Sequence, residues 1–136
     1  MNGSYILLIR LAEGKTIHFG RHRQTYFRRG YYAYVGSAMR GLEARVNRHL
    51  SKGKKLHWHI DYLMDKASLT GVILAESDCR TECAIAQALH SHFDSIPGFG
   101  SSDCHCPSHL FFSTNKKELE QRAMGVLKSL GLKPQS

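Results

Sequence analysis

Short runs of apolar residues alternate with polar breaks along the first third of the chain, which predicts β-strands. The apolar runs cover residues 5–11, 16–19 and 31–35, and they are rich in β-branched and aromatic residues. Such residues fit the pleated, half-buried surface of a sheet. We therefore expect three strands here, with the basic segment 20–30 adding a further strand and a turn.

From residue 41 onward the apolar positions recur every three to four residues, the period of a helix that faces a core. Leu42, Val46 and Leu50 form the first such stripe, which predicts a helix over 41–50. Three further helices are expected: one over 57–66, one from the N-cap Asp78 to about residue 92, and one over about 115–131, where Asn115 is the N-cap. Two further strands are expected at 69–75 and 109–112.

The order of these elements predicts an α+β domain, an α/β sandwich in which helices flank a small, mostly antiparallel sheet. The 136 residues fit one such domain over 1–136, and a hydrophobic content of 42 % is enough for a core. The sequence shows neither an export signal nor a run long enough to span a membrane, so we expect a cytoplasmic protein with reduced cysteines.

The formal net charge of +8 favours a polyanionic partner. Arginines alternate with Tyr26 and Phe27 in the segment 20–30, and a second basic run covers 52–55. Arginine for phosphates and aromatic rings for bases are typical of nucleic-acid surfaces, although a solvated surface is the alternative. The residues expected to contact nucleic acid are Arg21, Arg23, Arg28, Arg29, Lys54 and Lys55.

Two tyrosine motifs and a basic helix follow one another along the chain. Gly3-Ser4-Tyr5 opens the first strand, Tyr34-Val35-Gly36 closes a later one, and Arg45 and His49 lie four residues apart on the next helix. This layout resembles the GIY-YIG nuclease superfamily, and most closely its small Uri-type branch, which includes a domain fused to endonuclease III in some archaea. The resemblance covers about residues 3–112, and the stretches most similar to that branch are 30–50, 54–63 and 96–111.

The resemblance implies a metal-dependent endonuclease that hydrolyses phosphodiester bonds in DNA or RNA, with DNA favoured over RNA and with a role in DNA repair. In such enzymes Tyr5 and Tyr34 would flank the reacting phosphate and activate water, Arg45 would bind the phosphate, and His49 would transfer a proton. A helix-borne carboxylate would hold Mg²⁺ or Mn²⁺, because hard cations prefer oxygen ligands.

The chain also departs from the family pattern. Tyr5 and Tyr34 are farther apart than in the family, which predicts an inserted β-hairpin between them. The family's metal-binding Glu and its later Asn align with Gln87 and Gly100. The alternatives are a metal site rebuilt from other carboxylates, or an inactive module that binds nucleic acid or recruits a partner such as a DNA-repair glycosylase. The carboxylates available for a rebuilt site are Glu82 and Asp103.

Cysteine and histidine side chains gather in the second half of the sequence. Five of them could ligate zinc in a structural adaptor, but the spacing lacks two Cys-x₂₋₄-Cys pairs, so we favour buried free thiols and do not expect zinc. For His57 and His59, packing with hydrogen bonds to Asp61 or to the backbone is the preferred interpretation. The five possible ligands are Cys79, Cys83, Cys104, Cys106 and His109.

Overall fold

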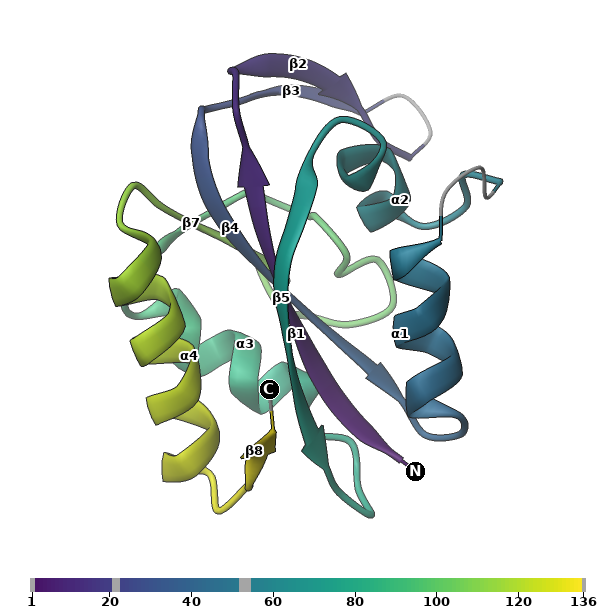
Figure 1. Cartoon of the computed structure of the whole chain (residues 1–136), viewed down its shortest axis with the longest axis vertical. Helices are drawn as coiled ribbons and strands as arrows, with labels where there is room; N and C mark the ends of the chain where they lie inside the picture. The colour runs from purple at the N-terminus through teal and green to yellow at the C-terminus, as the bar shows by residue number, and fades with distance from the viewer. Residues whose placement is uncertain (1, 21–22, 52–54, 136) are drawn as a thin grey trace.

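A six-stranded sheet forms the centre of the computed structural model, which describes residues 2–20, 23–51 and 55–135 (Figure 1). The strand order is β6-β7-β4-β1-β5-β8, and every neighbouring pair is antiparallel. This confirms the predicted α+β class. The strands are β1 (Gly3–Leu11), β4 (Gly30–Ala38), β5 (Ser68–Glu76), β6 (Asp94–Ser95), β7 (Leu110–Ser113) and β8 (Pro134–Gln135).

A β-hairpin lies between the two central strands in sequence, as predicted. Its strands, β2 (Lys15–His18) and β3 (Gln24–Phe27), pair antiparallel in a separate two-stranded sheet at the top of Figure 1. The hairpin returns the chain so that β4 pairs with β1 along its whole length. Tyr5 is then opposite Gly36 and Leu7 is opposite Tyr34, which places the two tyrosine motifs on neighbouring strands.

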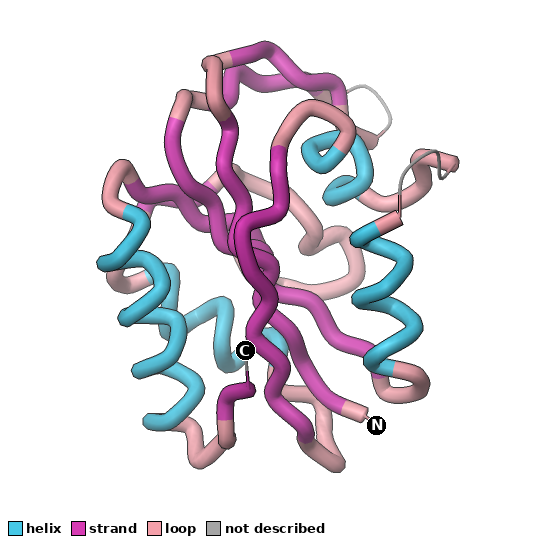
Figure 2. The backbone as a smooth tube through the Cα atoms, viewed as in Figure 1, coloured by secondary structure: helices cyan, strands magenta, loops and turns pink. Residues whose placement is uncertain are grey.

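Helices cover both faces of the main sheet (Figure 2). The helices α1 (Leu42–Leu50) and α2 (His59–Met64) pack on one face, and α3 (Glu82–His90) and α4 (Lys116–Ser129) pack on the other. Side chains alternate along a strand. Tyr5 and Leu7 of β1 therefore face α1 and α2, whereas Ile6 and Leu8 face α3 and α4.

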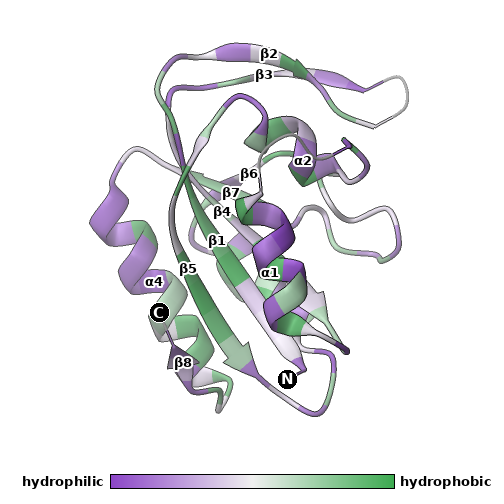
Figure 3. Cartoon of the chain, turned by 45° about the vertical axis from the view of Figure 1, so that its right-hand side comes forward, coloured by the Kyte–Doolittle hydropathy of each residue, from purple (hydrophilic) through white to green (hydrophobic). Residues whose placement is uncertain are grey.

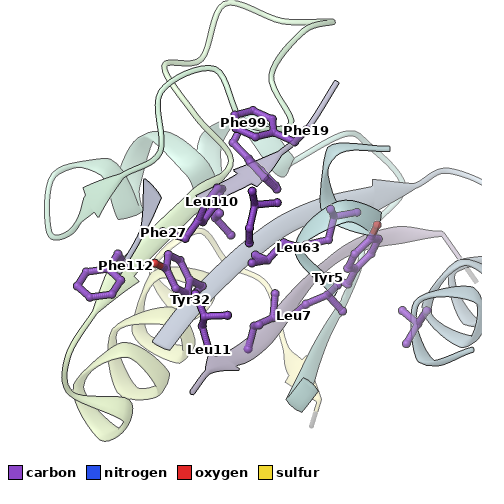
Figure 4. Close-up of a cluster of buried hydrophobic side chains, with 14 of the residues drawn as sticks. Tyr5, Leu7, Leu11, Phe19, Phe27, Tyr32, Leu63, Phe99, Leu110 and Phe112 are labelled. Atoms are coloured by element: carbon purple, nitrogen blue, oxygen red, sulfur yellow. The ribbon is translucent and has the colours of Figure 1, made fainter. Parts of the chain in front are cut away.

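Two hydrophobic clusters hold these layers together. The first joins β1 and β4 to α1, α2 and the hairpin, and its aromatic side chains include Phe19, Phe27 and Phe99 (Figure 4). The second joins the same strands to α3 and α4. Figure 3 shows the matching pattern, with hydrophobic residues along β1 and β5. Each fully buried Val, Leu, Ile, Phe or Met side chain contributes about 1.5–3 kcal/mol to the free energy of folding, so hydrophobic burial is the main source of stability.

Three details differ from the sequence-based expectations. Leu50 is 55 % exposed, and His49, rather than Leu50, is buried beside Leu42 and Val46. The third helix begins at Glu82 behind Thr81, not behind Asp78. The strands β6 and β8 were not predicted, because two residues carry no periodic signal. Among the described residues, no helix is long and apolar enough to cross a membrane.

The last helix begins as predicted at Asn115. Its Oδ1 accepts a hydrogen bond from the backbone N–H of Glu118 at 3.0 Å. The backbone N–H of Asn115 donates a hydrogen bond to Ser113 Oγ at 3.0 Å. In a capping box the Glu118 side chain would accept this bond, so here Ser113 takes the place of Glu118 as the acceptor.

Candidate functional site

Five of the predicted site residues line one cavity of about 680 Å³. Tyr5 comes from β1, Tyr34 from β4, Arg45 from α1, Glu82 from the first turn of α3, and Asp103 from the loop before β7. The cavity is therefore built by elements from both faces of the sheet, at the end where β4 leads into α1. Its remaining walls are the segment 57–59 and the loop 100–104.

The two tyrosines face the cavity side by side. Their ring centroids are 6.5 Å apart, and the planes are inclined at 47°. A Cβ on Gly36 would lie 2.4 Å from the ring of Tyr5, so this position requires glycine. Burial raises the pKa of both hydroxyls, although the charge of Arg45 beside them lowers it in part. Both hydroxyls are therefore protonated at neutral pH and can donate hydrogen bonds.

His49 lies behind Tyr5 rather than in the wall of the cavity. It is 2 % exposed, and its Nε2 is 2.8 Å from Tyr5 Oη. Its ring also lies beside Tyr5 and Trp58, with centroid distances of 5.4 and 5.8 Å. The structure thus places the predicted proton-transfer residue where it orients Tyr5 and can exchange a proton with its hydroxyl.

Arg45 is held by two contacts. Its Nη1 donates to the backbone oxygen of Ser37 at 2.8 Å, and its guanidinium lies 4.7 Å from the centre of the Trp58 ring. A guanidinium has five N–H donors, and the bond to Ser37 uses one. The side chain is therefore fixed in direction and retains donors for an anion in the cavity.

Asp61 fixes the wall that supports Arg45. Its carboxylate is fully buried and accepts two bonds from Arg48, at 2.9 and 3.1 Å, and two from the backbone N–H groups of His57 and Trp58, at 2.9 and 2.8 Å. Burial alone would raise the pKa of Asp61, but these hydrogen bonds and the charge of Arg48 lower it overall. The carboxylate stays ionised and ties the segment 57–59 to α1.

The two histidines of the segment 57–59 make different contacts, and both line the cavity. The ring centroid of His57 lies 5.8 Å from that of Trp58 and its backbone N–H donates to Asp61, whereas His59 Nδ1 accepts a hydrogen bond from the backbone N–H of Gly100 at 2.9 Å. Burial and the neighbouring charge of Arg23 lower the pKa of His59. The ring is therefore neutral near pH 7, as an acceptor at Nδ1 must be.

Glu82 is the carboxylate that α3 presents to the cavity. Its Oε1 accepts a hydrogen bond from Ser37 Oγ at 2.9 Å and lies 4.0 Å from Arg80 Nη1, and its Oε2 lies 3.6 Å from His109 Nδ1. Asp103 lines the same cavity from the opposite loop and is exposed. Both predicted metal-binding carboxylates therefore border this cavity.

Several cavity residues were not expected from the sequence, and two of them contribute charged or polar contacts. Arg80 adds a second guanidinium to the lining, and Ser37 contacts both Arg45 and Glu82. Arg80 stands in a turn without a distinctive pattern. Ser37 directly follows the Tyr34-Val35-Gly36 motif, and this position is the one feature of the sequence from which its place in the cavity could have been inferred.

The predicted basic surface is divided among separate places. Arg23 lines a separate cavity together with Phe19, although its charge acts on His59, whereas Arg28 pairs with Asp94 at 3.2 Å. Lys55 accepts a bond from Arg48 through its backbone oxygen at 3.2 Å. Arg29 lines a different cavity together with Arg10. The two remaining predicted residues, Arg21 and Lys54, lie outside the described residues.

Four cysteine and histidine side chains converge at the wall of the cavity, and three of them, Cys83, Cys104 and His109, line it. The donor atoms of Cys83, Cys104, Cys106 and His109 all lie within 4.8 Å of one another. Cys79, the fifth expected ligand, is exposed and contacts Ser77 instead. Burial, with the neighbouring thiols, raises the pKa of Cys106 to about 12 and also raises that of Cys83, so neither is a reactive thiolate at neutral pH.

A protein-family model described as "Domain of unknown function DUF123" matches residues 4–132. The chain belongs to this family. The DUF123 match spans both hydrophobic clusters and every cavity residue described above, so the site belongs to the shared domain. No curated protein and no solved structure matches the chain.

Proposed function

We propose that this protein is a metal-dependent endonuclease of the GIY-YIG type, of the Uri-type branch, that hydrolyses phosphodiester bonds in DNA. One observation carries the proposal. Tyr5, Tyr34, Arg45 and Glu82 come from four separate elements and yet line a single cavity, although Tyr5 and Glu82 are far apart in sequence. These side chains are those needed to bind a phosphodiester, to position water and to hold a cation.

The carboxylates at the cavity fit Mg²⁺ or Mn²⁺. Glu82 is oriented by Ser37 and directed at the cavity, and Asp103 offers a second oxygen donor from the facing loop. A hard cation held there would stabilise negative charge on the phosphate and lower the pKa of nearby water. Glu82 thus takes the place of the family carboxylate that Gln87 lacks.

The other residues have roles that their contacts support. Arg45, fixed by Ser37 and Trp58, donates to the phosphate oxygens. The protonated hydroxyl of Tyr34 donates to the phosphate or to the attacking water. Tyr5 relays a proton: its hydroxyl passes its proton to Nε2 of His49, 2.8 Å away, as its oxygen accepts a proton from the attacking water.

The charge of the molecule supports a nucleic-acid substrate. The net charge is +8, Arg45 and Arg80 both line the cavity, and the charge of Arg23 acts on the lining residue His59. Cationic groups of this kind bind phosphates without reading sequence, which gives salt-dependent affinity. We therefore propose recognition of DNA structure rather than of a base sequence, in keeping with a role in DNA repair.

The test is cleavage of labelled single-stranded, duplex and branched DNA, with RNA counterparts, in Mn²⁺ or EDTA. The key variants are Glu82→Gln and Arg45→Ala, and the matched controls are Glu120→Gln and Arg122→Ala on the outer side of α4. We expect metal-dependent cutting that falls by about 100-fold or more in the key variants, because each removes a charge that stabilises the transition state. The controls should retain wild-type rates.

Binding is measured on the same substrates by fluorescence anisotropy. Glu82→Gln should bind DNA at least as tightly as wild type, because the substitution removes a carboxylate that repels phosphate. Binding without cutting across the whole panel would refute the nuclease proposal and support the non-cleaving module that recruits a partner, such as a repair glycosylase.

A further inference from the structure

Three segments bring soft metal ligands to one point beside the cavity. Cys83 is the second residue of α3, Cys104 and Cys106 lie in the loop between β6 and β7, and His109 immediately precedes β7. His109 is 2 % exposed and Cys106 is 8 % exposed, while the other two are half-buried. A buried thiol commonly packs as a small apolar group, but three thiols and an imidazole that meet at one point form a complete ligand set.

The distances fit a tetrahedral zinc ion. With Zn–S near 2.3 Å and Zn–N near 2.0–2.1 Å, tetrahedral geometry places sulfur atoms about 3.8 Å apart and sulfur and nitrogen about 3.6 Å apart. The donor atoms here lie within 4.8 Å of one another, and Cys104 Sγ is 3.4 Å from His109 Nε2. Side-chain movements of less than about 1 Å therefore complete the tetrahedron.

The surroundings of His109 match those of a metal-bound imidazole. Its Nε2 faces the thiols, and its Nδ1 lies 3.2 Å from the backbone oxygen of Val35 and 3.6 Å from Glu82 Oε2. Metal-ligating histidines usually donate their other N–H to a carbonyl or carboxylate, which fixes the tautomer. Val35 and Glu82 supply these two acceptors.

We propose that Cys83, Cys104, Cys106 and His109 bind one zinc ion in a closed, structural site. Three thiolates and an imidazole select zinc over the hard cations, and four protein ligands leave no position open for catalysis. The ion would fasten the loop 96–108 to α3 and to the start of β7. It would thereby hold Ser102 and Asp103, which line the cavity, opposite Glu82. Its four ligands are not those proposed for Mg²⁺ or Mn²⁺, although Cys83, Cys104 and His109 line the same cavity.

The test measures metal content in the full chain, purified without a metal-affinity tag and without added metal. Elemental analysis should find close to one zinc per chain in the wild type and in Cys79→Ser, the matched control at an exposed cysteine outside the cluster. Cys104→Ser should retain less than about one tenth of that amount after dialysis, because a serine hydroxyl is a poor zinc ligand. Zinc is measured without nucleic acid, so its absence would leave the nuclease proposal standing.

A second measurement avoids the risk that a cysteine variant fails to fold. Wild-type protein freed of metal is titrated with Co²⁺ and followed by absorption. We expect intense visible bands of tetrahedral cobalt together with thiolate-to-cobalt charge transfer, both displaced by an equivalent of Zn²⁺. Iron in place of zinc, full zinc content in Cys104→Ser, or a wild type that neither contains zinc nor gives the tetrahedral cobalt spectrum would overturn the proposal.

Discussion

Replacing Asp61 by asparagine should destabilise the fold strongly, although the two side chains have nearly the same shape. The native carboxylate is fully buried and accepts four hydrogen bonds, two from Arg48 and two from backbone N–H groups. An asparagine has one oxygen, which can keep the three bonds that Oδ2 accepts from His57, Trp58 and Arg48 Nη2. Its amide NH₂ group would then face Arg48 Nη1, donor against donor.

The size of the effect follows from these contacts. A hydrogen bond between charged partners contributes about 1.5–3 kcal/mol, and breaking a buried ion pair costs about 3–5 kcal/mol. Arg48 is 30 % exposed and regains some hydration, which reduces the cost. We therefore expect the free energy of unfolding to fall by about 3 kcal/mol, near the lower limit of that range.

Urea denaturation followed by circular dichroism measures this loss. With a slope near 2 kcal/mol per molar, the midpoint should fall by about 1.5 M. The matched control is Asp65→Asn, which removes an exposed pair with Lys66 and should change stability by less than about 0.5 kcal/mol. A loss in Asp61→Asn no larger than in this control would refute the assigned role of the buried pair.

Two further predictions concern the pH dependence of stability and the glycine at position 100. The folded-state pKa of Asp61 lies below its unfolded value, so the stability that its carboxylate contributes is complete above about pH 5 and is lost as the pH falls through 4 and below. Urea titrations from pH 7 to 3 should therefore show the free energies of unfolding of wild type and Asp61→Asn converging, and a constant difference between them would contradict this. Gly100→Ala should destabilise the protein by about 1–3 kcal/mol, because φ at this position is +69° and the new Cβ would lie 2.9 Å from the Tyr34 ring. The control Gly125→Ala, in open space on α4, should stabilise it by about 0.5–1 kcal/mol. Equal effects of the two substitutions in thermal denaturation would show that the backbone at Gly100 is not constrained.

Hydrophobic periodicity in the sequence was sufficient to predict the main helices and strands but not to predict where they begin and end. The long strands and the stripe of α4 were predicted because many residues contribute to each pattern. On α1 the stripe was extended from Leu42 and Val46 to Leu50, yet the helix buries His49. The hydroxyl of Tyr5 provides His49 with a partner at 2.8 Å, and this tertiary contact has no signature in the local sequence.

The same limit explains the cysteine cluster. In sequence, Cys79 and Cys83 lie four residues apart, so a helix behind an N-cap at Asp78 would place both thiols on one face. The helix begins only at Glu82, so Cys79 stays in the preceding turn. Cys83 instead meets ligands more than 20 positions later in the chain, because the loop before β7 folds back onto α3. Such pairings depend on where a helix begins, which is the least certain feature of a sequence-based prediction.

The resemblance matched the family's metal-binding Glu with Gln87, but Glu82 is the α3 residue whose carboxylate lines the cavity. Five residues on a helix turn about 140° beyond one full revolution, so the two positions cannot share a direction. Glu82 is in the first turn of α3, where it contacts Ser37 and lines the cavity, whereas Gln87 is exposed. The acid at the cavity is therefore set by where α3 begins. Its Oε2 lies 3.6 Å from His109, a member of the proposed zinc site, so the ion that holds the loop would also restrain the carboxylate proposed to hold the reacting metal.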